Sequence, residues 1–272
     1  RRTFKINGML PRTPRRGTNV QTIKERYELI QRQIADAADR SGHDASQIHM
    51  VAVTKHAPVD EVRQLVDLGH ADFGENRQQH FTQIAAQIEE YVGRRKELGE
   101  PDLANPIRWH FIGHLQRNKC RRVLPLARLI HTLDSLRLAE EIQEIAEKRN
   151  QIIEVLLQIN VSRERQKTGI APAAVGYLLE QLQSMPCIKP RGMMCMAPLS
   201  DNPEDSRPVF SRCNELFEEM KLDKNSGNAF NILSMGMSND FEVAVECGAN
   251  IVRVGTALFG ENAVPTASCD RH

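Results

Sequence analysis

The chain has 272 residues, which is long enough for one large core or two small domains. Its 36 Lys and Arg residues balance 35 Asp and Glu residues to a formal net charge of +1, which argues against nucleic-acid or anionic-membrane binding. Six cysteines are scattered without a C-x-x-C pair, and no apolar run is long enough to cross a bilayer. We therefore expect a soluble protein of the reducing cytoplasm, without a disulfide framework or a metal site.

The first segment, residues 1–20, is basic and lacks acidic residues and apolar periodicity, which predicts a disordered tail. Regular structure is expected from Thr22, which together with Glu25 forms a capping box ahead of an amphipathic helix through Asp39. A second disordered tail is expected over residues 263–272.

Short apolar segments then alternate with amphipathic ones. The expected strands are 48–53, 71–73, 108–112, 129–133, 152–161, 189–196, 231–235 and 251–254, and the expected helices between them are 59–68, 77–98, 118–123, 135–150, 172–184, 203–220 and 241–247. This alternation predicts a parallel α/β fold, a single modified (β/α)8 TIM-type barrel over residues 21–262 with an extra N-terminal helix. A doubly wound open sheet is the competing architecture.

The functional face of such a barrel lies at the carboxyl ends of its strands. The residues with useful chemistry at those ends are Lys55, Asn76, His110, His114, Asp134, Asn160, Met194, Ser238, Arg253, Gly255 and Thr256. We expect them to surround the barrel mouth.

Lys55 directly follows an apolar strand and is expected to direct its stem into that mouth. Partial desolvation there lowers the pKa of a lysine and favours the free amine, which attacks an aldehyde to form a Schiff base. The alternative is an ordinary strand-end lysine whose ammonium group reaches solvent.

The last two strands each end in a turn of small residues, at 236–239 and at 255–256. Ser238, Asn239 and Asp240 stand where the following helix begins, and a helix N-terminus presents free N–H groups to an anion. Two such turns after the last two strands are how (β/α)8 barrels bind phosphate. Ordinary helix capping is the alternative interpretation.

A phosphate site and a lysine that forms a Schiff base suggest one ligand, pyridoxal 5′-phosphate (PLP), which carries both a phosphate and an aldehyde. Arg253 precedes the second turn by two residues. If its guanidinium donates to the pyridine nitrogen, that nitrogen stays unprotonated, which disfavours carbanion chemistry. Alternatively, Arg253 forms a salt bridge with an inward acid in the barrel core.

Seven motifs occur in order along the chain. They are AVTK (52–55), DFGEN (72–76), WHFIGHLQRNK (109–119), HTLDS (131–135), RGMM (191–194), SMGMSND (234–240) and RVGTALFG (253–260). Together they resemble the pyridoxal phosphate homeostasis protein family, which is related to the barrel domain of alanine racemase. The similarity runs from about residue 20 to residue 260.

The resemblance implies specific roles for these residues. Lys55 would form the Schiff base with PLP, and Arg253 would contact the pyridine nitrogen. The remaining implied contacts are Ser238, Asn239, Gly255 and Thr256 to the phosphate, Asn76 and His110 along the cofactor, Met194 near the ring, and Lys167 as a secondary anion or cofactor contact.

The resemblance also implies a function, because family members are regarded as carriers or regulators of PLP. We expect a protein that holds PLP as an internal aldimine and buffers it or passes it to PLP-dependent apo-enzymes, without robust catalysis. We expect a monomer or weak homodimer.

The sequence leaves two enzymatic alternatives. An amino-acid racemase of low activity would lack the second base, because alanine racemase takes a tyrosine from an extra domain for which this chain is expected to leave no room, and Tyr27, Tyr91 and Tyr177 all lie in expected helices. A metal-dependent hydrolase would use His110 and His114, but a strand followed by a glycine turn does not give the i, i+4 spacing that pairs two imidazoles on a helix.

Overall fold

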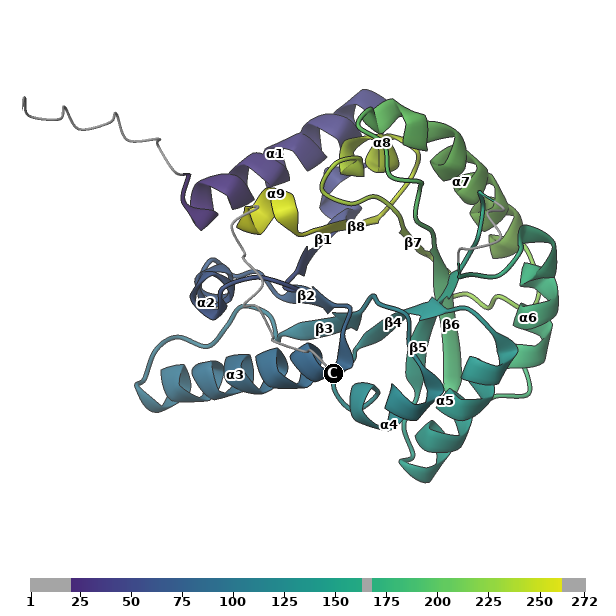
Figure 1. The fold of residues 1–272 in the computed structure, drawn as a ribbon, viewed down its shortest axis with the longest axis horizontal. Coiled ribbons are helices and arrows are strands. Elements are labelled where there is room, and N and C mark those ends of the chain that lie inside the picture. The colour runs from purple at the N-terminus through teal and green to yellow at the C-terminus, as the bar shows by residue number, and fades with distance from the viewer. Residues whose placement is uncertain (1–20, 163–167, 261–272) are drawn as a thin grey trace, which may run out of the picture.

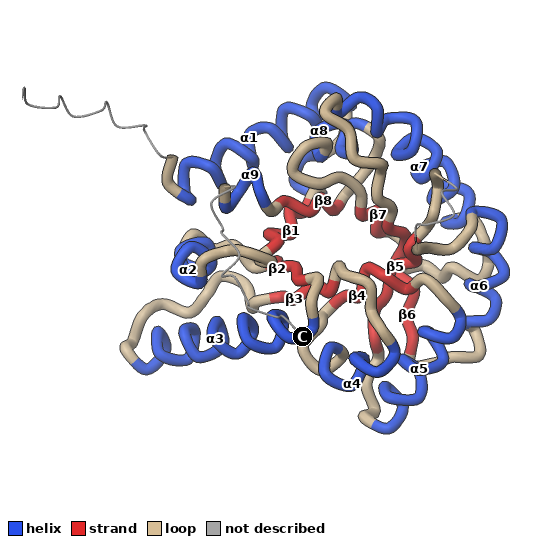
Figure 2. The backbone as a smooth tube through the Cα atoms, in the orientation of Figure 1, coloured by secondary structure: helices blue, strands red, loops and turns tan. Residues whose placement is uncertain are grey.

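The computed structural model describes residues 21–162 and 168–260. Eight parallel strands form an inner ring, and the helices surround it (Figures 1 and 2). The ring is a closed barrel in which β1 pairs with both β2 and β8, so the (β/α)8 prediction is confirmed and the open sheet is wrong. The strands are β1 (His49–Val53), β2 (Asp72–Glu75), β3 (Arg108–Phe111), β4 (Leu129–Leu133), β5 (Ile153–Gln158), β6 (Ile188–Met194), β7 (Ile232–Ser234) and β8 (Ile251–Val254).

The helices follow the expected order, with several short 3-10 turns. They are α1 (Ile23–Ser41), α2 (Val59–Asp67), α3 (Gln78–Glu97), α4 (Cys120–Val123), α5 (Leu136–Lys148), α6 (Val175–Leu182), α7 (Arg207–Lys221), α8 (Phe241–Glu246) and α9 (Thr256–Phe259), with 3-10 turns at η1 (Ala45–Gln47), η2 (Arg117–Lys119), η3 (Pro172–Ala174) and η4 (Pro203–Ser206). The expected tails, 1–20 and 263–272, and Lys167 lie outside the described residues.

The strands are buried on both faces, and successive side chains alternate between the barrel interior and the helices. Five interior residues form an apolar cluster of their own, Val51, Leu129, Leu156, Met194 and Ile251. Their strand neighbours, such as Met50, Ala52 and Ile130, belong to the larger core beneath the helices. This alternation decides which polar residues point inward.

The extra helix α1 covers the outer side of β8 and β1, where α8 has only six residues. The Thr22–Glu25 capping box predicted for its start is confirmed. Figure 1 shows α1 lying along α8 and α9, and Arg26 Nε donates to the carbonyl of Leu258 at 2.5 Å while Arg40 pairs with Glu242 and Glu246. The helix therefore closes the wall of the barrel rather than extending from it.

The expected strand 152–161 is shorter than predicted and ends at Gln158. After it, the backbone bonds locally to a later segment: Asn160 N donates to Ile170 O and Ile170 N donates to Gln158 O. The loop thus folds back on the end of β5 and takes up the polar groups that a longer strand would have used.

Three further findings concern composition. The five cysteines within the described ranges are free thiols. In the same ranges no helix has the length and apolarity needed to traverse a bilayer. Nor do the described His, Cys, Asp and Glu residues form any group of three or more that could hold a metal ion.

Candidate functional site

The backbone next to Lys55 is fixed by the neighbouring strand. Thr54 N donates to Gly74 O at 3.0 Å, and the Thr54 hydroxyl donates to Glu75 Oε1 at 2.5 Å. The Glu75 side chain is fully buried and also accepts from His80 Nδ1 at 2.8 Å, which raises the pKa of His80. These bonds anchor the strand end from which Lys55 projects.

Lys55 itself is exposed, so the partial desolvation expected from the sequence is not observed. The reason is its place two residues beyond Val53, the last paired position of β1, at the open rim of the barrel. Within the described chain it forms no ion pair. Burial, and then the charges of Lys55 and Arg77, lower the pKa of the neighbouring His56.

The turns that follow β7 and β8 meet directly. Ser238 Oγ accepts hydrogen bonds from the backbone N–H groups of Gly255 at 3.0 Å and Ala257 at 3.3 Å. Gly236, with φ of +83°, allows the first turn, since a Cβ there would lie 2.6 Å from the Cβ of Ala244. Two N–H groups of the second turn therefore point at one oxygen of the first.

The other residues of the first turn behave differently from the expected helix caps. Asn239 Nδ2 donates to Ser200 O at 2.8 Å, across to the loop after β6. Asp240 is buried, and its two carboxylate oxygens accept from Met237 N and from the Ser206 hydroxyl. None of these side chains caps α8, so their hydrogen bonds join loops instead.

Arg253 is only 4% exposed. Its Nη1 donates to Ser234 Oγ at 2.6 Å and its Nη2 donates to Cys195 O at 3.0 Å. Burial lowers the pKa of this guanidinium. No carboxylate of the described chain lies within ion-pair distance of it, so the salt bridge considered as the alternative does not form.

Within residues 21–162 and 168–260, six buried side-chain atoms have no hydrogen-bond partner. Two of them, Asn76 Oδ1 and Gln158 Oε1, belong to residues at the carboxyl ends of β2 and β5. Asn76 is held tightly, because a Cβ on Gly113 would approach its carbonyl oxygen to 2.0 Å. Gln158 was not singled out from the sequence. The available signal was a polar residue that directly follows the apolar run 155–157 at the carboxyl end of a strand.

The remaining predicted residues lie in different surroundings. Met194 is completely buried in the interior cluster. His110 is 5% exposed, and both its ring nitrogens bond within the barrel. His114 is exposed and pairs with Asp134 at 3.1 Å. Thr256 is exposed at the start of α9.

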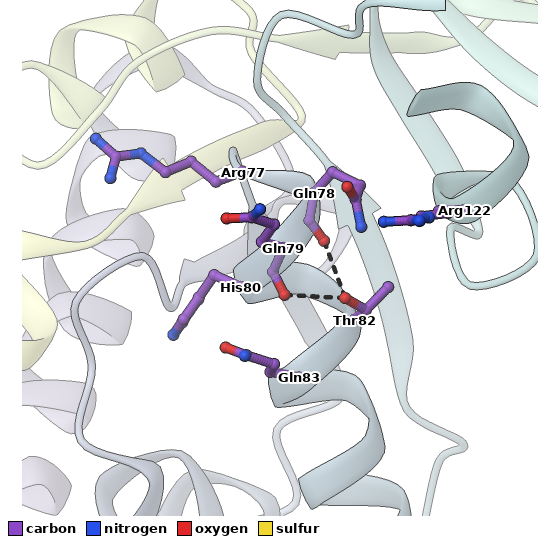
Figure 3. Close-up of a pocket in the computed structure, with 7 residues that line it drawn as sticks. All are labelled: Arg77, Gln78, Gln79, His80, Thr82, Gln83 and Arg122. Carbon is purple, nitrogen blue, oxygen red and sulfur yellow. Dashed lines mark hydrogen bonds between the residues drawn. The ribbon is translucent and has the colours of Figure 1, made fainter. Parts of the chain in front are cut away.

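A pocket also lies outside the barrel, at the start of α3 beside α4. Figure 3 shows that Arg77 and Arg122 extend to opposite sides of the helix start. The His80 ring is directed away from Arg122, and its Nδ1 already bonds Glu75. The lining side chains do not converge on a common point, which favours the barrel mouth as the functional site.

Comparison with known proteins agrees with this architecture. The family described as "Alanine racemase, N-terminal domain" matches residues 19–263. The pyridoxal phosphate homeostasis protein of Aquifex aeolicus (strain VF5) is 38% identical over 237 residues, covering 87% of this chain and 97% of that protein. The protein of the same name from Pseudomonas aeruginosa is 35% identical over 241 residues, covering 89% and 96%.

A solved structure is also similar along nearly the whole barrel. PipY of Synechococcus elongatus PCC7942, with PLP bound, superimposes with a TM-score of 0.69 at 29% identity, covering 85% of this chain and 100% of that one. The chain therefore belongs to the pyridoxal phosphate homeostasis protein family, and its barrel is that of the alanine racemase N-terminal domain.

Proposed function

We propose that this protein binds PLP at the barrel mouth through Lys55 and serves intracellular PLP homeostasis as a carrier, buffer or regulator. The observation that carries the proposal is the meeting of the turns after β7 and β8 at Ser238, beside the strand end that bears Lys55. β1 and β8 are paired neighbours, and a Cβ on Gly255 would lie 3.3 Å from the Cβ of Val53. The amine that reacts with the aldehyde and the turn that binds the anion thus lie side by side, at the carboxyl ends of β1 and β8.

The phosphate is assigned to the second turn. The N–H groups of Gly255 and Ala257 already converge on one oxygen, that of Ser238, and a phosphate oxygen suits the same donors. The hydroxyl groups of Ser238 and Thr256 supply further donors. Asn239 contributes through its backbone, because its side chain is committed to Ser200.

The ring of the cofactor is assigned to the interior side of the mouth. Asn76 brings a buried oxygen that has no partner among the described residues, and Arg253 brings a buried guanidinium that pairs with no described carboxylate. Met194 belongs to the apolar interior cluster and stands at the carboxyl end of β6. His110 is placed as an indirect contributor, since both its nitrogens already have partners.

When bound, PLP supplies an aldehyde that forms a Schiff base with an amine. Lys55 provides that amine from an exposed position without a competing carboxylate, and its backbone is held by the Thr54–Glu75 bond. An exposed attachment point suits reversible exchange with solvent and with acceptor apo-enzymes. Free thiols at all described cysteines support a cytoplasmic location.

The racemase alternative gains no support from the site. The chain contains three tyrosines, and they lie on α1, α3 and α6, on the outside of the barrel. Tyr91 is bonded to Asp67 and Tyr27 packs against His70. A second base of the tyrosine type is therefore missing from the mouth.

The test is the visible absorption spectrum of the protein mixed with PLP, followed by borohydride reduction and peptide mapping. A yellow protein that carries a pyridoxyl group on Lys55 after reduction is the expected result. A protein that takes up no PLP, or is labelled at another lysine, would overturn the assignment. Incubation of the loaded protein with L-alanine, with chiral analysis of the product, measures any racemisation.

A further inference from the structure

Five side chains inside the barrel form one continuous hydrogen-bonded chain that ends at Arg253. His110 Nε2 lies 3.1 Å from Asp72 Oδ1, and His110 Nδ1 lies 2.9 Å from His131 Nε2. His131 Nδ1 in turn lies 3.1 Å from Ser234 Oγ, which accepts from Arg253 Nη1 at 2.6 Å. No role in PLP binding was assigned to Asp72, His131 or Ser234.

The chain crosses the barrel rather than following one wall. Asp72, His110 and His131 stand on β2, β3 and β4, whereas Ser234 and Arg253 stand on β7 and β8. Since β5 and β6 lie between β4 and β7 in the closed ring, the bond between His131 and Ser234 spans the interior. It joins residues 103 positions apart in the sequence.

The donors and acceptors fit one direction throughout. Arg253 can only donate, so Ser234 Oγ accepts from it and is left with its own hydrogen to give to His131 Nδ1. His131 then donates from Nε2 to His110 Nδ1, and His110 donates from Nε2 to the carboxylate of Asp72. In this arrangement both imidazoles are neutral and carry their proton on Nε2. Each donor and each acceptor named here forms one hydrogen bond of the chain.

The electrostatics agree with this direction. His131 is completely buried, and that burial, with the charge of Arg253 adding to it, lowers its pKa well below the usual value. Burial alone would raise the pKa of Asp72, but the bonds from Arg108 and His110 outweigh it and hold that carboxyl ionised. Asp72, at the end of the chain opposite Arg253, is thus a fixed acceptor, because Arg108 donates two hydrogen bonds to its carboxylate, of 2.7 and 2.6 Å.

We propose that Asp72, His110, His131 and Ser234 are positioning residues for Arg253. Their chain, anchored on the β2–β3 side, fixes the hydroxyl of Ser234 so that its lone pairs face Arg253, and with Cys195 O it holds the guanidinium in one orientation. The consequence for the pyridine ring rests on the proposed function. The positioning itself is a property of this chain alone.

The first test needs neither PLP nor a substitution. In protein labelled with ¹⁵N-histidine, the ring nitrogens of His110 and His131 report which of them carries the proton. We expect neutral Nε2–H tautomers for both, with Nδ1 unprotonated. A proton on Nδ1 of either residue at neutral pH would contradict the direction of the chain and overturn the proposal.

The second test breaks the chain beside Arg253. Ser234→Ala removes one hydroxyl and leaves the rest of the barrel filled, whereas Ser234→Thr retains the hydroxyl. Thr132→Val is the matched control, because Thr132 is equally buried on β4 but donates outside the chain, to Gly113 O at 2.7 Å. We expect Ser234→Ala to shift the side-chain ¹⁵N signals of Arg253 and of His131 Nδ1, and Thr132→Val to leave both unchanged.

The same variants are then titrated with PLP. Ser234→Ala is expected to weaken PLP binding about fivefold, the value of one ordinary hydrogen bond, and to move the visible absorption maximum in the same direction as Arg253→Ala. Ser234→Thr should restore the maximum. Unchanged Arg253 signals in a folded Ser234→Ala protein would show that Ser234 does not position Arg253, whether or not PLP binds. If those signals shift as expected but the unsubstituted protein takes up no PLP, the positioning role stands and the proposed function fails.

Discussion

Polar groups at the barrel mouth and polar groups in the barrel interior differ in how completely their hydrogen bonds are satisfied. At the mouth, Lys55 is exposed and has no ion pair with any residue that the structure describes, and Asn76 Oδ1 and Gln158 Oε1 are buried without a partner among the same residues. In the interior, the chain from Asp72 to Arg253 pairs its members in one consistent direction. Unsatisfied buried groups cost free energy, so a ligand that reaches Asn76 Oδ1 and Gln158 Oε1 gains hydrogen bonds that the protein alone leaves unmade.

The comparison also separates two kinds of role. Lys55 and Asn76 Oδ1 at the mouth are available to touch a ligand, whereas Asp72, His110, His131 and Ser234 in the interior chain are already bonded to one another or to Arg253. Substitutions at the mouth should therefore alter binding and leave stability nearly unchanged, while substitutions in the interior should alter both.

The largest effect is expected at Lys55. Lys55→Ala should abolish covalent attachment of PLP completely, while its free energy of unfolding changes by less than about 0.5 kcal/mol, because the side chain is exposed. Borohydride reduction with mass spectrometry measures attachment, and urea titration measures stability. The control is Lys189→Ala, which removes an exposed lysine near the amino end of β6, away from the mouth, and should retain full labelling. Labelling that persists in Lys55→Ala would refute the assignment of the Schiff base to Lys55.

A strong effect is also expected at the second turn. Gly255→Val should weaken PLP binding about a hundredfold, because branched carbons beside the Gly255 N–H keep a phosphate away from the backbone. The measurement is a PLP titration followed by absorbance. Gly93→Val on α3 is the control, since a Cβ there meets nothing within 4 Å. Equal affinity in both variants would place the phosphate elsewhere.

The interior chain should give a pH signature. The folded pKa of His131 is lowered, so its contribution to stability is present above the unfolded value of about 6.5 and is lost as pH falls below it. The folded pKa of Asp72 is also lowered, so a second loss begins below about pH 4. Urea midpoints should fall in these two stages, and Asp72→Asn should reduce the second, to which other carboxyl groups of lowered pKa such as Glu246 also contribute. A midpoint that rises on acidification from pH 7 to 5 would show that His131 is not held neutral.

The smallest effect is expected at Asn239. Its amide bonds Ser200 O on an exposed loop, so Asn239→Ala should change PLP affinity by less than about threefold, in contrast to the turn glycine. Calorimetric titration resolves a difference of this size. A loss as large as that of Gly255→Val would mean that the Asn239 side chain turns toward the phosphate on binding.

Much of this structure followed from local pattern. The capping box of α1 and the order of the eight strands were predicted, as was the placement of all three tyrosines on helices. The ends of elements were less predictable. The segment 152–161 read as one strand, but its last residues bond to Ile170, a contact that depends on how the next loop returns. Ser238 similarly read as a helix cap, and its hydroxyl instead serves the neighbouring turn.

By itself the sequence determined the periodicity, and so the parallel barrel and the residues at its strand ends. The tertiary structure decided which of those residues meet. Lys55 is exposed because β1 ends two residues before it, at Val53, on an open rim, and that exposure depends on the loops around it. The chain from Asp72 to Arg253 exists because closure of the ring brings β4 to face β7, and no local pattern specifies a hydrogen bond between residues 103 positions apart.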